Sequence, residues 1–503
     1  MKLNTSLLAL GAANALALSP EPPYVTSRQP SPTLQPSAEE IYEVQKHAEA
    51  SSPTSDVKGL AFDRIVQIWL ENNNFEVAAK DLNMQWIASN GLLLSNYFAV
   101  THPSQPNYAA AVGGDHFGMD HDEFITIPAN VSTVVDLLDT KGITWGEYQE
   151  HLPYAGFAGM NFSNQLHNFM DDYVRKHNPL ILYDNVAHNP DRVKLIKNFT
   201  GFYDDLEACK IPQWSFITPN MTNDAHDTNM TFAAKWTRDF LEPLLNNSYF
   251  MENTLIIVSF DENENFPITN RVYTVLLGGA IDKSLHGTVD SMYYNHYSTI
   301  STVSVNWDLP SLGRWDCDAN VLGFVAEKAD YINTNISLDG LYFNASYPGP
   351  IGDKKYTPAW WPAPNTQAKC AAGNGVLPSV VDTWGADSPG SYNYTNVYPY
   401  NNRAGGGKET EGPYTEVIGF MDAAGGNARK KGVKGQGNET TPATVSSPSG
   451  SRPVPSSGGG GDSGGAGDGA AGSFPTSQAA VIIAPGNWVV RLVGVAAVAA
   501  IFL

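Results

Sequence analysis

Two short runs of acidic and amide residues follow strongly apolar stretches, and together they could hold a metal ion. Glu71-Asn72 follows the apolar run 62–70, and Asp261-Glu262 follows the run 254–260. In open α/β sheets, functional sites form at the carboxyl ends of strands. Carboxylates that emerge together from buried strands repel one another unless a cation or protons relieve them. Either run alone is typical of a polar turn at a strand end, but both together predict a divalent metal site.

Ser104 lies in a segment that could present a nucleophile. Residues 101–108 read Thr-His-Pro-Ser-Gln-Pro-Asn-Tyr, and the prolines at 103 and 106 restrict the backbone on either side of the serine. We therefore expect a turn here and not a regular helix start. A hydroxyl in such a turn becomes a nucleophile when a metal or a base lowers its proton affinity. The alternative is a Ser-Pro turn without a catalytic role.

Two histidines are further candidates for chemistry. His226 lies between Asp224 and Asp227, where it could act as a metal ligand, a phosphate ligand or a general acid. His296 lies in an Asn-His-Tyr-Ser sequence. Because a lone histidine is more often structural, His296 becomes a candidate only in company with the other motifs.

The elements that must position these residues alternate along the chain from about 59 to 345. Residues 62–70, 254–260 and 272–277 are predicted strands, and residues 132–141 and 231–245 are predicted helices. Near-continuous apolar strands separated by helices indicate a parallel sheet that is covered on both faces. The predicted fold class is therefore α/β, with three layers (α/β/α) and a largely parallel central sheet.

The two ends of the chain carry targeting patterns. The short apolar run 7–18 predicts a cleaved secretory signal peptide, because it is too short to span a bilayer. Near the other end, a Gly/Ser-rich stretch and a spacer precede the apolar tail 488–503, which is the pattern of a GPI-anchor signal. A stop-transfer helix is the alternative, although the tail is short for one. We expect a secreted protein held at the cell surface, on the plasma membrane or in the cell wall.

These patterns divide the chain into six segments. In order, they are a signal peptide (1–17), a flexible leader (18–56), a catalytic domain (57–348), a loop-rich lobe packed on it (349–424), a Gly/Ser/Pro-rich stalk (425–473) and the anchor signal (474–503).

Composition limits the partners and supports secretion. The net charge of −21 argues against non-specific nucleic-acid binding and against a polybasic membrane patch. Three cysteines allow at most one disulfide, and the sequence leaves open which two would pair. Nine Asn-x-Ser/Thr triplets predict glycosylation at Asn130, Asn161, Asn198, Asn229, Asn246, Asn335, Asn344, Asn393 and Asn438.

Five motifs in this order resemble the phosphoesterase family, over about residues 60–345. They are Glu71-Asn72, the segment 102–108, Pro219-Asn220 with residues 224–227, the segment 260–263 and the segment 296–298. The family includes fungal and bacterial acid phosphatases and phospholipases C, and it belongs to the alkaline-phosphatase-like superfamily. The segment 101–108 is most similar to the fungal phosphate-repressible secreted acid phosphatases.

The resemblance implies a role for each motif. One divalent metal, of open identity, would be held by Glu71, Asn72, Ser104, Asp261 and Glu262, and the presence of a second metal is left open. The catalytic residues would be Ser104 as the nucleophile with His226 and His296, and the substrate-binding residues would be Asn107, Asp224, Lys176 and His177.

The implied function is that of an acid phosphatase. It would hydrolyse phosphate monoesters through a phosphoserine and scavenge phosphate at the cell surface, with membrane contact only through the anchor. A phospholipase C or phosphodiesterase is the alternative within the family. A non-catalytic cell-wall glycoprotein is the alternative outside it.

Overall fold

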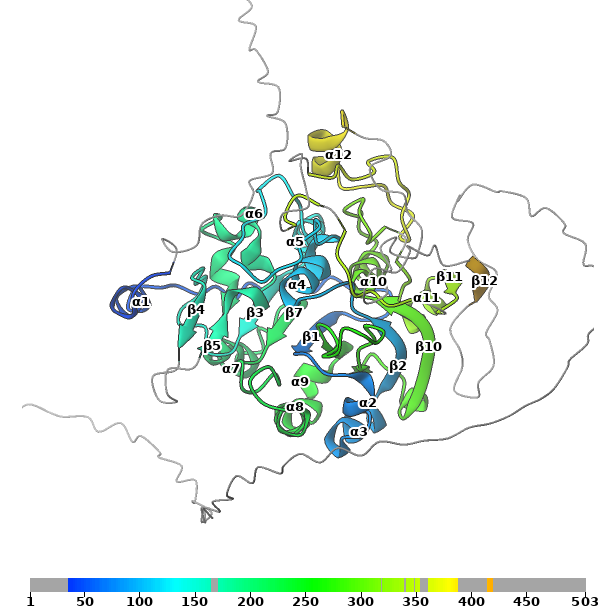
Figure 1. Ribbon diagram of the computed structural model, residues 1–503, viewed down its shortest axis with the longest axis horizontal. Helices are drawn as coiled ribbons and strands as arrows, with labels where there is room; N and C mark the ends of the chain where they lie inside the picture. Colours follow the sequence, from blue (N-terminus) through cyan, green and yellow to red (C-terminus); the bar gives the residue numbers. More distant parts are fainter. Residues whose placement is uncertain are drawn as a thin grey trace, which may run out of the picture. The chain divides into compact units, whose positions relative to one another are not determined.

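A computed structural model describes residues 35–163, 171–317, 319–338, 341–347, 349–352, 361–387 and 414–418. These residues belong to one compact unit, Met1–Glu439, and the second unit, Thr440–Leu503, lies outside them. The centre of the first unit is an eight-stranded sheet in the order β10-β2-β9-β8-β1-β7-β3-β6 (Figure 1). The sheet strands are β1 (Arg64–Leu70), β2 (Leu92–Phe98), β3 (Trp145–Gln149), β6 (Ile196–Lys197), β7 (Trp214–Thr218), β8 (Thr254–Phe260), β9 (Thr274–Leu277) and β10 (Thr288–Asn295). Two small sheets pair β4 (Asn161–Ser163) with β5 (Asp171–Val174) and β11 (Asn333–Ile336) with β12 (Tyr414–Ile418).

The sheet is largely parallel, as the sequence predicts. Strand β1 lies between β7 and β8 and is parallel to both, and all residues of β7 and β8 are buried. Strand β9 is the exception, since it runs antiparallel to β2 and β8. No helix separates β8 from β9, so the chain returns beside β8 as an antiparallel neighbour. The sequence pattern predicted this strand but not its direction.

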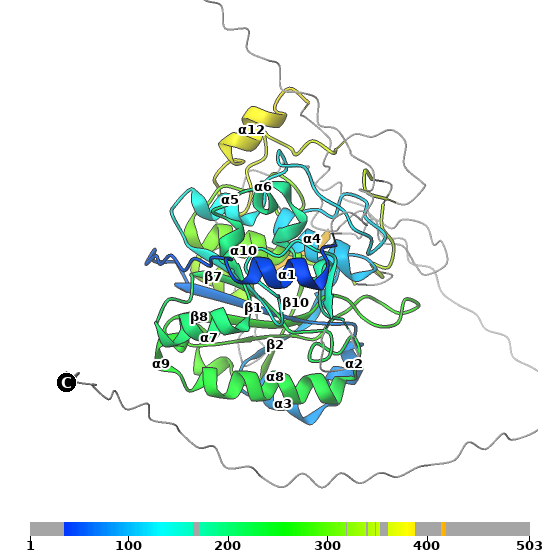
Figure 2. The same ribbon diagram turned by 90° about the vertical axis from the view of Figure 1, so that its left-hand side faces the viewer.

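Helices cover both faces of the sheet and complete the three layers. In Figure 2, α3 and α8 lie on one side, and α4, α5 and α10 lie on the other. The helices are α1 (Ala38–Gln45), α2 (Phe75–Ala78), α3 (Leu82–Ser89), α4 (Ser104–Gly113), α5 (Val134–Asp139), α6 (Asp184–Ala187), α7 (Phe199–Glu207), α8 (Met230–Leu245), α9 (Ser248–Met251), α10 (Tyr297–Trp307), α11 (Gly323–Lys328) and α12 (Pro378–Trp384). The predicted α/β fold class is confirmed.

The segment around Ser104 differs from its prediction. Ser104 is the first residue of α4, and every residue of this helix is buried. The expected turn is therefore wrong, and the reason is the position of Pro106. In the first turn of a helix the backbone N–H groups have no intrahelical partner, so a proline there breaks no hydrogen bond.

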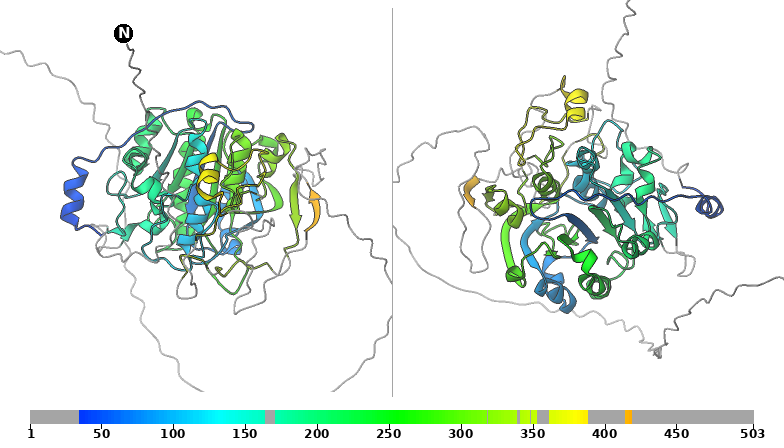
Figure 3. Two further views of the ribbon diagram at one scale, coloured as in Figure 1. Left: turned by 90° about the horizontal axis from the view of Figure 1, so that it is seen from above. Right: turned by 180° about the vertical axis from the view of Figure 1, so that it is seen from behind.

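Part of the predicted leader is ordered. Ser37 caps α1, and the segment that follows (blue in Figure 3) crosses the molecule to reach β1. Ser51 N donates to Lys194 O at 2.9 Å, and Leu60 N donates to Asn306 O at 2.8 Å. The prediction of a flexible leader is thus wrong for residues 37–56, which form a helix and a strap.

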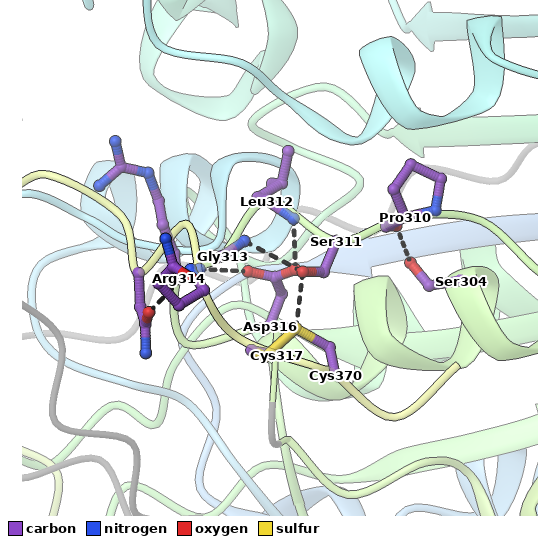
Figure 4. The surroundings of a disulfide bond; sticks show 11 residues. Ser304, Pro310, Ser311, Leu312, Gly313, Arg314, Asp316, Cys317 and Cys370 are labelled. Atoms are coloured by element: carbon purple, nitrogen blue, oxygen red, sulfur yellow. Dashed lines mark hydrogen bonds between the residues drawn. A yellow bond between two sulfur atoms is a disulfide. The ribbon is translucent and has the colours of Figure 1, made fainter. Parts of the chain in front are cut away.

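One disulfide joins the segment between α10 and α11 to the segment 361–387. Cys317 pairs with Cys370, and Cys209 is an exposed free thiol. Figure 4 shows the disulfide beside a loop in which the buried carboxylate of Asp316 accepts hydrogen bonds from two backbone amides. On the same segment, Trp384 is buried and donates its indole N–H to Asn130 O at 3.1 Å.

No helix in the described ranges is long and apolar enough to cross a membrane. The predicted signal peptide, stalk and anchor signal lie outside the described residues, as do Asn393 and Asn438.

Candidate active site

The strand register brings the two predicted ligand runs together. Leu70 pairs with Phe260 at the parallel ends of β1 and β8, so Glu71 and Asp261 leave the sheet side by side. Asp261 N donates to Leu70 O at 3.0 Å, and Asn72 N donates to Asp261 Oδ1 at 3.2 Å. Glu71, Asp261 and Glu262 are all buried. We call these three residues the carboxylate cluster.

Ser104 lies against the carboxylate cluster. Its Oγ donates to Glu71 Oε2 at 3.0 Å and lies 3.5 Å from Glu262 Oε1. The serine is buried at the first turn of α4, where the positive end of the helix dipole favours negative charge such as that of a phosphate. The hydroxyl is thus held where carboxylates can receive its proton.

Asn107 ties the start of α4 to the segment that precedes Ser104. Its Oδ1 accepts from Val100 N at 3.0 Å, and its Nδ2 donates to Thr101 O at 2.9 Å. The same Nδ2 lies 3.4 Å from Glu262 Oε2. The amide that was predicted to bind substrate therefore also ties the start of α4 to the carboxylate cluster.

His177 lies between two carboxylates. Its Nε2 is 3.2 Å from Glu71 Oε1, and its Nδ1 is 3.5 Å from Asp224 Oδ2. Asp224 reaches this position on the loop after β7, where its carbonyl accepts from Glu71 N at 2.8 Å. Both residues were predicted to bind substrate, and the structure places them directly beside the predicted metal ligand.

Charge is distributed unevenly among these three groups. Burial raises the pKa of Glu71, but the positive charges of His177, Lys176 and His226 outweigh it and bring this pKa down to about 2. Burial lowers the pKa of His177, but contact with Glu71 and Asp224 outweighs it and raises this pKa to about 9. Burial raises the pKa of Asp224 to about 6. At neutral pH, His177 is therefore a cation facing the Glu71 anion.

The other two members of the cluster have no such cation in contact. Burial, together with the charge of Glu71, raises the pKa of Asp261 well above its ordinary range. Burial and the charge of Asp261 do the same to Glu262. Asn72 Oδ1 is buried and accepts no hydrogen bond from the described residues, and Asp261 has Ser104 as a side-chain neighbour that lowers its pKa without offsetting burial. An unpaired buried oxygen beside repelling carboxylates suits a hard divalent cation, so the predicted ligand set fits a metal.

A second grouping of possible metal ligands overlaps the first. One ligand atom from each of Glu71, His177 and His226 lies within 4.8 Å of the others. The sequence left His226 open as a metal ligand but gave His177 to substrate binding, because the position of His177 in the sequence does not show that it approaches Glu71.

Lys176 and His226 lie nearer the solvent. Lys176 Nζ is 3.0 Å from Asp122 Oδ2 and 3.2 Å from His226 Nε2. His226 Nδ1 is 2.9 Å from Asp227 Oδ1, and the imidazole is 27% exposed. This pair can therefore reach a ligand that enters from solvent.

His296 is placed behind the carboxylate cluster. Its Nε2 is 2.6 Å from the backbone oxygen of Asp261, and its Nδ1 is 3.4 Å from Tyr97 OH. Its ring packs on Trp69 with centroids 4.4 Å apart, and burial lowers its pKa to about 3. These contacts position the Asp261 backbone, whereas direct participation of His296 in catalysis stays a prediction.

Two contacts of the site were not predicted. His102 Nδ1 is 2.6 Å from Glu262 Oε2, and Tyr108 OH donates to Glu71 Oε1 at 2.6 Å. Tyr108 follows Ser104 by four residues, so a helical interpretation of this segment would have placed both on one face. No comparable signal points to His102, whose contact comes from tertiary folding.

The structure corrects one predicted glycosylation site. Asn344 is buried, and its Nδ2 donates to the carbonyl oxygens of Phe266 and Ile268, the latter at 2.7 Å. This nitrogen cannot carry a glycan in the folded chain. Asn229 and Asn246 are exposed. The sites at Asn130, Asn161, Asn198, Asn229, Asn246 and Asn335 stay predictions.

Known proteins resemble this chain over most of its length. The sequence model of the Phosphoesterase family matches residues 69–310. An acid phosphatase of Aspergillus fumigatus is 56% identical over 73% of this chain and 82% of its own length. A phosphate-repressible acid phosphatase of Penicillium chrysogenum is 49% identical over 80% of this chain and 95% of its own length. Among solved structures, a protein of the alkaline phosphatase superfamily from Vibrio parahaemolyticus is 12% identical over 56% of this chain and 71% of that chain, with a TM-score of 0.33.

Proposed function

Since this chain belongs to the Phosphoesterase family and is a hydrolase of phosphoric ester bonds, we propose that it is a secreted acid phosphatase acting through a phosphoserine at Ser104. The observation that carries this proposal is the Ser104 hydroxyl, which is buried against Glu71 and Glu262 at the ends of two core strands. A buried serine aimed at carboxylates is arranged as a nucleophile and not as a surface turn.

In the first step, Ser104 Oγ bonds to phosphorus while the bond from phosphorus to the ester oxygen breaks. The hydroxyl proton leaves along one of the two contacts of Oγ, to Glu71 or to Glu262. Cationic His177 faces Glu71 and balances the negative charge that gathers around the phosphoryl group.

The departing ester oxygen needs a proton. His226 is the partly exposed imidazole of the site, and contact with Lys176 and Asp227 fixes both of its ring nitrogens. Because Nε2 accepts from the Lys176 ammonium, the proton comes from Lys176, and we assign the Lys176–His226 pair the role of proton donor to the leaving group. Water then attacks the phosphoserine, phosphate is released and the Ser104 hydroxyl is restored.

A divalent ion held by Glu71, Asn72, Asp261 and Glu262 would lower the proton affinity of Ser104 and neutralise phosphoryl charge. The support in this chain is the three buried carboxylates, which repel one another, together with Asn72 Oδ1, which is buried and accepts no hydrogen bond within the described ranges. His296 and His102 fix the ligands by contacting the Asp261 backbone and the Glu262 carboxylate.

The location is proposed from the sequence. The signal-peptide pattern, the glycosylation triplets and the anchor pattern support a cell-surface protein that scavenges phosphate, and the Cys317–Cys370 disulfide suits an oxidising compartment. A phosphatidylinositol-specific phospholipase should release the protein from cells. Retention in the membrane fraction would contradict the anchor.

The function is tested with purified wild type and Ser104→Ala on p-nitrophenyl phosphate and on phosphatidylcholine. We expect wild type to hydrolyse the monoester only. Ser104→Ala should lose at least about 1,000-fold in rate, because the covalent step disappears. Acid quenching during turnover should trap phosphate on Ser104 in the wild type. A variant that keeps a tenth of the activity would refute the phosphoserine, and cleavage of phosphatidylcholine alone would favour a phospholipase C.

A further inference from the structure

An exposed aromatic residue follows the carboxylate cluster directly. Phe266 is 51% exposed and Ile268 is 40% exposed, and both lie in the segment 264–269 between β8 and β9, which we call the rim loop. Burial of a phenylalanine side chain is favourable, and here Phe266 and Ile268 together leave apolar surface in solvent beside a polar site.

The exposure of Phe266 does not come from a loosely held loop. Asparagine side chains fix the rim loop at its start, middle and end. Asn263 N donates to Asn270 Oδ1 at 2.8 Å, Asn265 N donates to Asn74 Oδ1 at 3.2 Å, and Asn344 Nδ2 donates to the Phe266 and Ile268 carbonyls. Just beyond the end of this loop, Asn270 Nδ2 donates to Thr101 O at 2.8 Å, three residues before Ser104. The ring is thus fixed relative to Ser104.

Phe266 is joined to the nucleophile through three contacts. Its ring stacks on the buried imidazole of His102, with centroids 3.9 Å apart and planes inclined by 24°. His102 Nδ1 contacts Glu262 Oε2 at 2.6 Å, and Glu262 Oε1 lies 3.5 Å from Ser104 Oγ. Stacking covers one face of the ring, and the exposed half of the residue remains available to a ligand.

We propose that Phe266 is a specificity residue that stacks with the leaving group, so that the enzyme favours phosphate monoesters of aromatic alcohols. This inference rests on the proposed phosphatase function. When the phosphoryl group of a substrate contacts Ser104, the organic part of the ester must extend toward solvent, past the rim of the site. A planar ring gains more from a fixed aromatic face than a flexible polyol does, because stacking needs two rigid surfaces.

The test compares Phe266→Ala with wild type on phenyl phosphate and on glycerol 2-phosphate. We expect kcat/KM for phenyl phosphate to fall about tenfold, as for the loss of one stacked aromatic contact, while kcat/KM for glycerol 2-phosphate stays within about twofold. Inhibition by inorganic phosphate should not change, because phosphate has no leaving group. Phe266→Trp should retain the preference for the aryl ester.

Tyr203→Ala is the matched control. Tyr203 is 53% exposed on α7, which packs on β3 and β6 at one edge of the sheet, whereas Phe266 follows the central strand β8. Its removal should not alter the preference. The inference would be overturned if kcat/KM fell equally for both esters or for neither. It would also be overturned if phosphate inhibition weakened together with phenyl phosphate hydrolysis. A wild-type protein inactive on both esters would instead overturn the proposed function.

Discussion

The carboxylate cluster at the ends of β1 and β8 and the carboxylate of Glu147 on β3 are equally buried, but their surroundings differ. Glu71, Asp261 and Glu262 share one space around Ser104. Glu147 has no other carboxylate in contact among the described residues. Its Oε1 accepts from Leu180 N at 3.0 Å, and its Oε2 accepts no hydrogen bond from this part of the chain. Burial raises the pKa of Glu147 to about 8.

The difference shows that burial affects the protonation of a single carboxyl group differently from that of three neighbouring ones. A single buried carboxyl keeps its proton and remains neutral, which removes most of the cost of burial. In the cluster, Glu71 stays ionised beside His177, and its charge adds to burial in raising the pKa of both Asp261 and Glu262. Three neighbouring buried carboxylates therefore bind positive charge strongly, and a single proton does not neutralise them. Clustering, and not burial, therefore marks the functional carboxylates.

The most damaging change to the cluster should be Asp261→Asn. It keeps the shape but removes one unit of ligand charge, so bound metal and activity should both fall, activity on the order of 100-fold. Excess divalent metal should restore part of the activity. Metal content and rate are measured on the same preparation, with chelator-treated wild type for comparison.

Asp290→Asn supplies the control for losing a buried aspartate. Asp290 on β10 is buried, with Oδ1 accepting from Met292 N and Oδ2 from Tyr294 OH, and it makes no contact with the cluster. This variant should lose stability without losing metal. If Asp261→Asn kept its metal and its rate, the metal-assisted mechanism would have to be abandoned.

A smaller effect is expected from His177→Gln, which removes the cation that faces Glu71. Since His177 is the foremost cause that lowers the pKa of Glu71, this pKa should rise in the variant. Glu71 would then take up a proton at higher pH, and the acid limb of the pH–rate profile should move to higher pH. We expect a rate loss of about tenfold near neutral pH. An acid limb that does not move would show that Glu71 does not need this cation.

The sequence predicted the strand ends better than the residues around them. Glu71 and Asp261 follow long apolar runs, and parallel strands bring their carboxyl ends to one edge, so pattern alone placed them together. Pattern could not place side chains that depend on tertiary contacts. His102 reaches Glu262 only because the segment before α4 packs against Asn270, which lies between β8 and β9. The ring direction of His296 is fixed by Trp69 and Tyr97.

Two further misses have a local cause. The prolines beside Ser104 indicated a turn. A proline is also tolerated in the first turn of a helix, but recognising this requires knowing that the helix begins at Ser104. Strand β9 was predicted from its composition, but strand direction depends on the connection before it, which here holds no helix. In both cases the segment was identified correctly, but the start of the helix or the direction of the strand was not.

The smallest expected effect on activity belongs to Glu147→Gln, which tests the other half of the comparison. The folded chain keeps the Glu147 proton up to about pH 8, whereas an unfolded chain releases it near its ordinary pKa of 4.5. Between these values the folded state binds more protons, so this group makes wild type less stable as pH rises, and the loss is complete above about pH 8. Glutamine has no proton to lose.

The melting temperature of the variant, measured by calorimetry across this range, should therefore fall less steeply than that of wild type, while phosphatase activity at acid pH stays unchanged. If the melting temperatures of variant and wild type fell equally with pH, Glu147 would ionise in the folded chain as it does in water. The contrast with the carboxylate cluster would then not rest on burial.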